Sequence, residues 1–345
     1  MANIYTQIRD IWNSSSQAQL MITCLQGRKG NIRDFHRTLG NTGYLSGTEY
    51  KEILLSGKPA CIDREGTLIF AEPFYKKERV IVYGGGHIAL PVVQLAKLVG
   101  FYAVVIDDRG QFANRERFPE ADEVICDSFE ASISRIKPAE SDYNVIITRG
   151  HKHDILCIRE LMQYKEPVYT GLIGSRRRTS AIMEHLTEEG YDRDRLMRIR
   201  TPIGLPIGAV TTEEIAVAII AEIIQRKRLQ SAENMAVNRS DGDDRVMELL
   251  AGLDRPCCLA TIMHSEGSVP RKAGAKMLVF EDTATFGSIG GGCVEAGMIR
   301  KAVSMIGSGT YEVIHATLDS EDAMSEGMVC GGSLKLLLED FTQQL

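Results

Sequence analysis

Two cysteines in the last third of the sequence lie beside glycines. One follows three glycines in the stretch GSIGGGCVE, and the other precedes a glycine pair in the fragment MVCGG. Glycine permits backbone conformations in which successive amide N–H groups point into one concavity, where they can hold an anion. A thiol or carboxylate beside such a concavity is a candidate for catalysis or for metal contact. The candidates are Cys293, Cys330, Glu295, Gly290, Gly291 and Gly292.

A helix is predicted from Val294 to Ile306, directly after the first of these thiols. The helix N-terminus favours the thiolate of Cys293, and an acid such as Glu295 is favourable in the first turn. Arg271 adds a cation from the preceding basic loop, EGSVPRKAGAK. We expect the two thiols to lie near each other and to face a cleft. The alternative, that the glycines form hairpin turns and the cysteines are buried packing residues, stays open.

A second glycine cluster, GGGHIA, follows the strand-like run RVIVY and opens a helical stretch. It fits the pattern G-x-G-x-x-A, in which the glycines allow a tight turn and close approach of a phosphate to a helix N-terminus. Asp107 and Asp108 end the next strand-like run and could hold a ribose diol. The alternative is a turn that binds no ligand. The candidate binding residues are Gly84, Gly85, Gly86, His87, Asp107 and Asp108.

Two later strand ends carry further polar residues, and ligands gather at the carboxyl ends of parallel strands. In TRGHKHD, His151 and His153 could contact a metal or a substrate, or could form a solvated loop. In GLIGSRRR, Ser175 is placed to cap a helix that begins with arginines, which a helix N-terminus disfavours unless an anion lies nearby. The binding candidates there are Gly174, Ser175, Arg176 and Arg177; a surface basic run is the alternative.

Alternating strand and helix patterns over residues 77–230 predict an α/β fold with a Rossmann-like parallel sheet. Residues 231–244 are polar and are predicted to be a linker. Residues 245–345 are predicted to form a smaller α+β domain, because a helix pattern and separate strand patterns succeed one another. Residues 1–76 have a similar order of elements and end in TLIFAEPF, compared with SLKLLLEDF. We therefore predict that they are a degenerate copy of the C-terminal domain, without its two cysteine motifs.

The composition is that of a folded protein, with 44% hydrophobic and 25% charged residues in a chain of 345. The net charge of −6 argues against a general nucleic-acid partner. The N-terminus lacks a signal-peptide pattern, and no apolar run is long enough to cross a membrane. We expect a cytoplasmic protein with no membrane partner, whose eight cysteines are reduced thiols.

Together VIVYGGGHIA, IDDR, YTGLIGSRRR, TPIGLPIGAVTTEEIAVAIIAEII, GSIGGGCVE and CGG resemble the XdhC/CoxI family of xanthine dehydrogenase accessory proteins. The resemblance implies a Rossmann-like domain paired with a smaller XdhC/CoxI-type domain that contains GSIGGGCVE. It also implies that Cys293 and Cys330 face the metal of a bound molybdenum cofactor, with Glu295 as a supporting residue of the same catalytic group. Here the GSIGGGCVE domain follows the Rossmann domain, whereas in the family it more often precedes it. The usual arrangement could be restored if the C-terminal domain docks across the Rossmann crevice, or if a homodimer supplies that domain in trans.

The resemblance implies the role of a cofactor chaperone rather than of a catalyst. Such a protein binds the molybdenum cofactor (molybdopterin), assists its sulfuration by a cysteine desulfurase, and assists its insertion into a xanthine dehydrogenase-type molybdenum hydroxylase. The alternative is an NAD(P)-dependent oxidoreductase that uses the Gly84 loop, which leaves GSIGGGCVE and CGG unexplained. A third possibility is a scaffold that binds a nucleotide only to regulate assembly.

Overall fold

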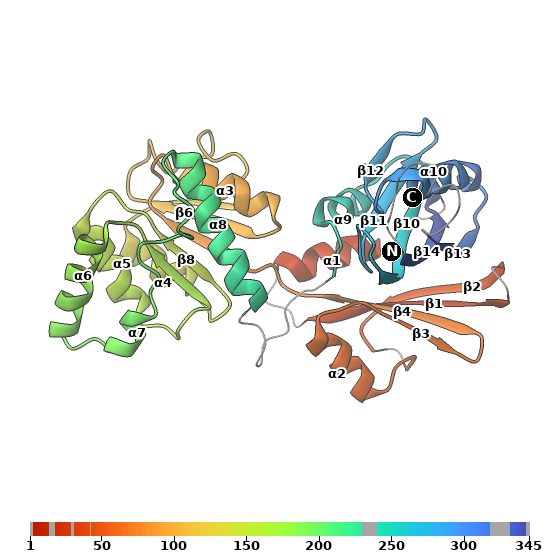
Figure 1. The fold of residues 1–345 in the computed structure, drawn as a ribbon, viewed down its shortest axis with the longest axis horizontal. Helices are drawn as coiled ribbons and strands as arrows, with labels where there is room; N and C mark the ends of the chain where they lie inside the picture. Colours follow the sequence, from red (N-terminus) through yellow and green to blue (C-terminus); the bar gives the residue numbers. More distant parts are fainter. Residues whose placement is uncertain are drawn as a thin grey trace. The chain divides into compact units, whose positions relative to one another are not determined.

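The chain forms two compact units (Figure 1). The computed structural model describes residues 3–13, 18–28, 31–41, 43–229, 240–317 and 332–342. One unit combines Met1–Lys76 with Met235–Leu345, and the other is Lys77–Asn234. The structure therefore places in one unit two parts of the chain that the sequence patterns suggested as separate domains.

The Lys77–Asn234 unit is built on a parallel sheet with strand order β7-β6-β5-β8-β9. This order, with a glycine-rich turn after the first strand, confirms the predicted Rossmann-like fold. The strands are β5 (Arg79–Tyr83), β6 (Tyr102–Asp107), β7 (Glu123–Cys126), β8 (Tyr143–Ile146) and β9 (Tyr169–Leu172).

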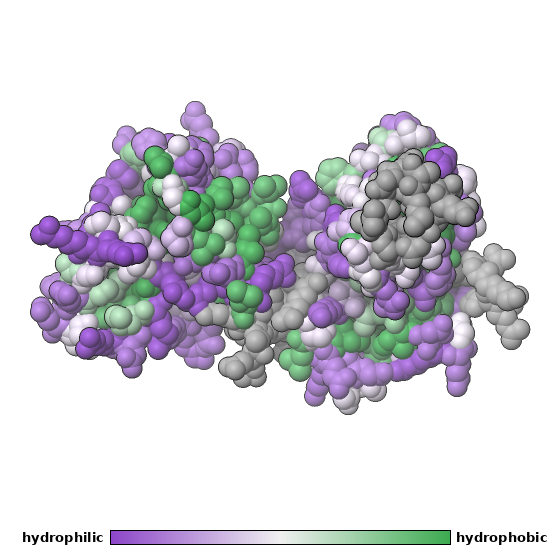
Figure 2. Space-filling model, viewed as in Figure 1, coloured by the Kyte–Doolittle hydropathy of each residue, from purple (hydrophilic) through white to green (hydrophobic). Residues whose placement is uncertain are grey.

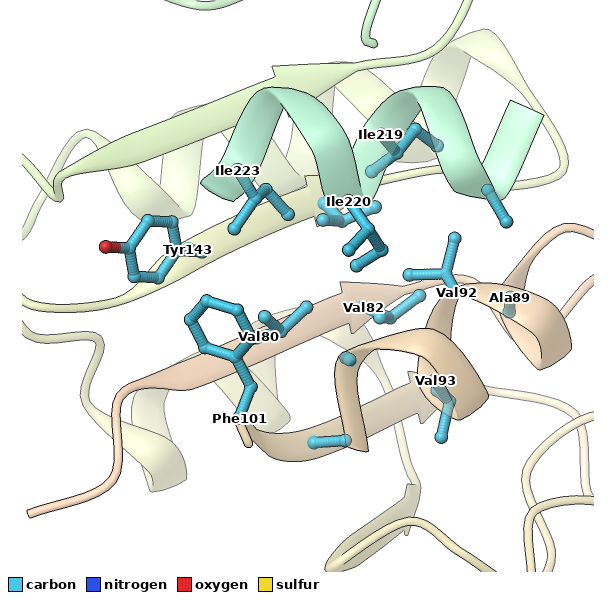
Figure 3. Close-up of a cluster of buried hydrophobic side chains, with 14 of the residues drawn as sticks. Val80, Val82, Ala89, Val92, Val93, Phe101, Tyr143, Ile219, Ile220 and Ile223 are labelled. Carbon is cyan, nitrogen blue, oxygen red and sulfur yellow. The ribbon is translucent and has the colours of Figure 1, made fainter. Parts of the chain in front are cut away.

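Helices cover both faces of this sheet because successive residues of its strands are apolar on both sides. In β5, Val80 and Val82 pack against α3 and α8, as Figure 3 shows, whereas Ile81 and Tyr83 pack against α4, α5 and α6. The helices are α3 (Ala89–Leu98), α4 (Phe129–Ile136), α5 (His151–Leu161), α6 (Arg176–Glu188), α7 (Arg193–Met197) and α8 (Thr212–Leu229).

Helix α8 is the last helix of this unit, and a capping box precedes it. The Glu214 carboxylate accepts from the N–H groups of Val210 and Thr211, and the Thr211 hydroxyl accepts from the Glu214 N–H. Figure 2 shows apolar residues on the visible face of the unit. Leu98 and Val217 are among the exposed large hydrophobic residues of this unit. In the described part of the chain, no helix has the length and apolarity needed to cross a membrane.

The other unit contains two antiparallel sheets. The first has strand order β2-β1-β4-β3 and the second has order β12-β11-β10-β14-β13. The elements of the first part are α1 (Ile4–Asn13), β1 (Gln19–Arg28), β2 (Asn31–Leu39), α2 (Gly47–Ser56), β3 (Ala60–Arg64) and β4 (Thr67–Phe74). Those of the second part are α9 (Asp244–Ala251), β10 (Cys257–Gly267), β11 (Lys276–Phe280), β12 (Thr285–Gly287), α10 (Gly292–Met305), β13 (Tyr311–Thr317) and β14 (Gly332–Asp340). The predicted smaller α+β domain is confirmed for the C-terminal part.

Candidate functional site

The glycine-rich loop lies between β5 and α3, at the carboxyl end of the first strand, as predicted. Gly84 has a φ of +113°, and a Cβ atom there would lie 2.5 Å from the carbonyl oxygen of Ile147. A Cβ at Gly85 would lie 2.0 Å from the carbonyl oxygen of Phe112, whereas one at Gly86 would meet no atom within 4 Å. The first two glycines are therefore required by packing, and only the third borders open space.

Asp107, at the end of β6, anchors this loop. Its side chain is buried and accepts hydrogen bonds from the Gly85 N–H at 2.8 Å and from the Arg109 Nε at 2.8 Å. The backbone N–H and the Nη2 of Arg109 add two more, at 3.1 and 2.9 Å. These contacts occupy both carboxylate oxygens with protein donors. The role of Asp107 as a ribose ligand therefore stays a prediction, while its contact with the loop is a structural fact.

Arginines that the sequence analysis did not select surround the same loop. The Arg117 Nε donates to the Gly85 carbonyl at 3.0 Å, and its Nη2 donates to the Gly86 carbonyl at 3.2 Å. Arg109 also stacks on the Phe112 ring at 3.8 Å. Within the described residues, the N–H groups of Gly86 and His87 have no protein acceptor. Free N–H donors and nearby guanidinium groups together form a setting that suits an anion.

Two ion pairs join neighbouring strand ends beside the loop. The hydrogen bonds from Arg149, which follows β8, lower the pKa of Asp108 to about 2. Asp154, in the first turn of α5, accepts hydrogen bonds from the Thr148 hydroxyl at 2.6 Å and from Arg178. Burial raises the pKa of Asp154 above its usual value, although both of these partners oppose the shift. The first pair links the segments that follow β6 and β8, and the second links the first turns of α5 and α6.

The predicted helix at the arginine run is present as α6, and Ser175 caps it by accepting from the Arg178 N–H. Gly174 precedes the cap with a φ of +148°. Arg176 and Arg177 are exposed in the first turn, and Arg176 lines a surface cavity of about 730 Å³ beside α6 and α7. Their role in anion binding stays a prediction, but nothing in the described part neutralises either side chain.

The histidines after β8 lie in the first turn of α5. His151 is exposed, and His153 meets the edge of the Phe129 ring at 5.6 Å. Among the residues that the structure describes, no three His, Cys, Asp or Glu side chains are grouped as a metal site would require. The predicted metal contact of His151 and His153 therefore remains a prediction.

Glu295 organises the GSIGGGCVE loop at the start of α10. One oxygen of its carboxylate accepts from the Gly291 N–H at 2.8 Å, the Ser288 hydroxyl at 2.9 Å and the Ile289 N–H at 3.2 Å. Gly290 and Gly291 have φ values of +130° and +76°, which L residues rarely adopt. Glu295 thus holds a glycine turn in a left-handed conformation against the helix N-terminus, a positioning role that the sequence analysis assigned only as support.

Arg271 lies in the basic loop that precedes the glycine turn and links this loop to Asp241. It donates its Nε to the Asp241 carboxylate at 2.9 Å and its Nη2 to the Asp241 carbonyl at 2.9 Å. Cys330 lies outside the described residues. Gly292 and Cys293 lie in the first turn of α10, but the structure describes only their backbone. The expected proximity of the two thiols remains a prediction.

Replacement of Gly86 by alanine should leave the melting temperature within about 2 °C of wild type, because the added methyl group meets open space. The same replacement should weaken the binding of a phosphate-bearing ligand at this loop. The matched variant Gly85→Ala places a methyl group against the Phe112 carbonyl and should lower the melting temperature strongly. Thermal unfolding and equilibrium binding of pyrophosphate separate the two effects. Unchanged pyrophosphate binding in Gly86→Ala would exclude the loop as a phosphate site.

Comparison with known proteins matches two segments of the chain to family models. Residues 80–223 match the XdhC Rossmann domain, and residues 251–316 match the XdhC and CoxI family. Among curated proteins, the chain is 34% identical over 166 residues to a Bacillus subtilis protein named as a probable xanthine dehydrogenase subunit, and the match covers 47% of each chain. It is 36% identical over 87 residues to "Molybdenum cofactor insertion chaperone PaoD" of Escherichia coli, covering 23% of this chain and 25% of that protein.

A crystal structure from Bacillus halodurans, described as a xanthine dehydrogenase, is similar with a TM-score of 0.50 and 27% identity. That similarity covers 66% of this chain and 65% of the other. The chain spans about half the length, or less, of the curated relatives that it matches. Since the two matched domains together cover more than half of the chain and contain both glycine motifs, the protein belongs to the XdhC and CoxI family.

Proposed function

We propose that this protein binds the molybdenum cofactor and assists its insertion into a xanthine dehydrogenase-type molybdenum hydroxylase. The observation that carries the proposal is the glycine turn at the start of α10, held by Glu295 inside the segment that matches the XdhC and CoxI family. A relative at 36% identity is named as a molybdenum cofactor insertion chaperone, which supports the same role here.

The chemistry of the two loops fits a phosphorylated pterin with a sulfur-bound metal. Amide N–H groups at a helix N-terminus and nearby arginines suit a phosphate, and both occur around Gly86. A cysteine at the start of α10 would have its thiolate favoured by the helix dipole, and thiolates are suitable ligands for soft metal centres. We therefore assign phosphate recognition to the glycine loops and metal-side contact to Cys293 and Cys330.

We assign to this chain the part of holding the cofactor while other proteins act on it. A cysteine desulfurase would supply the sulfur, and the hydroxylase would receive the finished cofactor. The alternative is an NAD(P)-dependent oxidoreductase that uses the Gly84 loop. The carboxylate of Asp107 already accepts from Gly85 and Arg109, and that of Asp108 accepts from Arg149, which counts against this alternative.

The test of the proposal is binding of isolated molybdenum cofactor to Cys293→Ser and Cys330→Ser variants. We expect each variant to melt close to wild type and to lose at least tenfold in cofactor affinity and in activation of a cofactor-free hydroxylase. Cys126→Ser is a matched control, because this exposed thiol lies in the Lys77–Asn234 unit, outside both glycine motifs. If wild type binds no cofactor, or if the variants bind it as tightly as wild type, the assignment is wrong.

A further inference from the structure

The two sheets of the Met1–Lys76 and Met235–Leu345 unit have the same topology. Each part begins with a helix, followed by an antiparallel pair, a second helix and another antiparallel pair. The strand order β2-β1-β4-β3 corresponds to β11-β10-β14-β13, and β12 is an extra strand at the outer edge of the second sheet. Under this correspondence α1 is equivalent to α9, and α2 is equivalent to α10.

The strand registers place individual residues in correspondence. Arg37 of β2 lies opposite Thr23 of β1, and Lys276 of β11 lies opposite Thr261 of β10. Each sheet thus has a threonine on the central strand that faces a basic residue on its neighbour. Arg37 and Lys276 are therefore equivalent positions.

The registers on the other side of each central strand, between β1 and β4 and between β10 and β14, relate a second pair of charged residues. Glu72 of β4 lies opposite Met21, and Glu339 of β14 lies opposite Leu259. Met21 and Leu259 each precede the matched threonine by two positions. Glu72 and Glu339 are therefore equivalent, and AEPF aligns with LEDF at the ends of β4 and β14.

These four charged residues form two buried ion pairs between the sheets. The Arg37 guanidinium donates to both oxygens of Glu339, at 2.8 and 2.7 Å. The Lys276 ammonium donates to Glu72. The basic residue of each part thus pairs with the acid of the other part. This reciprocal pairing indicates an approximate two-fold axis between the two parts. The same pairing occurs in the self-complementary interface of a symmetric dimer.

A third pair of contacts between the sheets follows the same symmetry. The Phe35 ring of β2 stacks on the Tyr311 ring of β13, with centroids 4.0 Å apart. The register relates Phe35 to Gly274 and Tyr311 to Pro59, the residues just before β11 and β3. A Cβ at Gly274 would indeed lie 3.3 Å from the Pro59 side chain. The two ends of the interface therefore contain equivalent contacts.

The apolar core between the sheets is symmetric as well. One cluster consists of Leu25, Phe70, Met263 and Leu337, in which Leu25 is equivalent to Met263 and Phe70 to Leu337. A second cluster joins α1 with α9 and contains both Phe74 and Phe341. Each copy also packs its own second helix on the outer face of its sheet. The inner faces of the two sheets therefore face each other, and Figure 1 shows β1–β4 below β10–β14.

We infer that residues 1–76 are a second copy of the C-terminal fold, and that they cover in cis the inner sheet face of the C-terminal copy. The interface is intramolecular, although the Lys77–Asn234 unit separates the two copies along the chain. The inner sheet face is therefore not available for a homodimer of this chain, which has to use another surface.

The two copies differ in the segment before the second helix. In the C-terminal copy this segment contains β12 and the glycine turn held by Glu295. In the N-terminal copy the connection runs only from Gly40 to Ser46, and Ser46 and Glu49 form a simple capping box on α2. Resting on the proposed function, this difference predicts one molybdenum cofactor per chain rather than two. Failure to bind any cofactor would count against the proposed function and leave the intramolecular interface unaffected.

The interface is tested in the full-length chain with the double variant Phe35→Cys/Tyr311→Cys under mild oxidation. We expect a disulfide between positions 35 and 311, identified by peptide mass spectrometry, in a product that runs at the mass of one chain on a non-reducing gel. The Phe35→Cys and Tyr311→Cys single variants are the controls for reaction with the natural cysteines.

Two outcomes would overturn the inference. A 35–311 disulfide found only at twice the chain mass would show that the N-terminal copy covers a partner chain. Absence of the disulfide, in a double variant whose circular dichroism matches wild type, would show that the two sheets do not meet at this edge. Intramolecular cross-linking at the expected mass supports the inference whether the chain is a monomer or a dimer.

Discussion

Replacing Lys276 by methionine should lower the free energy of unfolding of the Met1–Lys76 and Met235–Leu345 unit by about 3–5 kcal/mol. The Lys276 side chain is 2% exposed, and that of Glu72, its partner, is 4% exposed. Removing the ammonium leaves a buried carboxylate without a compensating charge, which costs more than the net value of the ion pair. Urea unfolding followed by far-UV circular dichroism measures the change.

Two controls separate this effect from a general loss of packing. The double variant Lys276→Met/Glu72→Leu removes both charges and should recover most of the lost stability. The variant Lys301→Met breaks an ion pair with Glu312 that is exposed on both sides and should change stability by less than about 1 kcal/mol. A Lys276→Met chain as stable as Lys301→Met would contradict the buried interface between the sheets.

Replacing Asp107 by alanine should cost the Lys77–Asn234 unit about 3 kcal/mol and abolish pyrophosphate binding at the Gly84 loop. The change removes a buried acceptor for four hydrogen bonds, one from Gly85 and three from Arg109. The Gly85 N–H then lies buried without a partner, and Arg109 loses the contact that holds it over Phe112. Both the loop and the arginine that borders it should become mobile.

The neighbouring acid offers a matched control for this prediction. Asp108 is only partly buried and pairs with Arg149, so Asp108→Ala should change stability by less than about 1 kcal/mol. Thermal unfolding and pyrophosphate titration of both variants give the comparison. Equal effects of the two substitutions on stability would show that Asp107 is not the anchor of the loop.

Local sequence patterns were sufficient to predict the Rossmann-like unit. Its strands consist of short apolar runs such as RVIVY and YAVVID, which a parallel sheet buried on both faces requires. The glycine loop and the helices after it were predicted for the same reason, because turn residues, caps and apolar spacing act within a few positions. The capping box at Thr211 and the helix after Ser175 belong to this class.

The partners of the site residues could not be predicted in the same way. Arg117 reaches the carbonyl groups of Gly85 and Gly86 from the segment after β6, and Arg178 reaches Asp154 from the next helix. Each contact depends on which strands are neighbours in the sheet and how long the connecting segments are. The sequence shows that both arginines follow the ends of strands. This indicates the edge of the sheet at which they lie, but not the residues that they contact.

The sequence by itself determined the alternation of strands and helices in the Rossmann-like unit, its parallel sheet and the two glycine motifs within the matched segments. Only the tertiary structure joined the first and last parts of the chain into one unit and paired Arg37 with Glu339, 302 positions apart. The physical reason is that secondary structure follows from interactions between near neighbours, whereas the pairing of two sheet faces depends on complementary shape and charge that exist only after both sheets have formed.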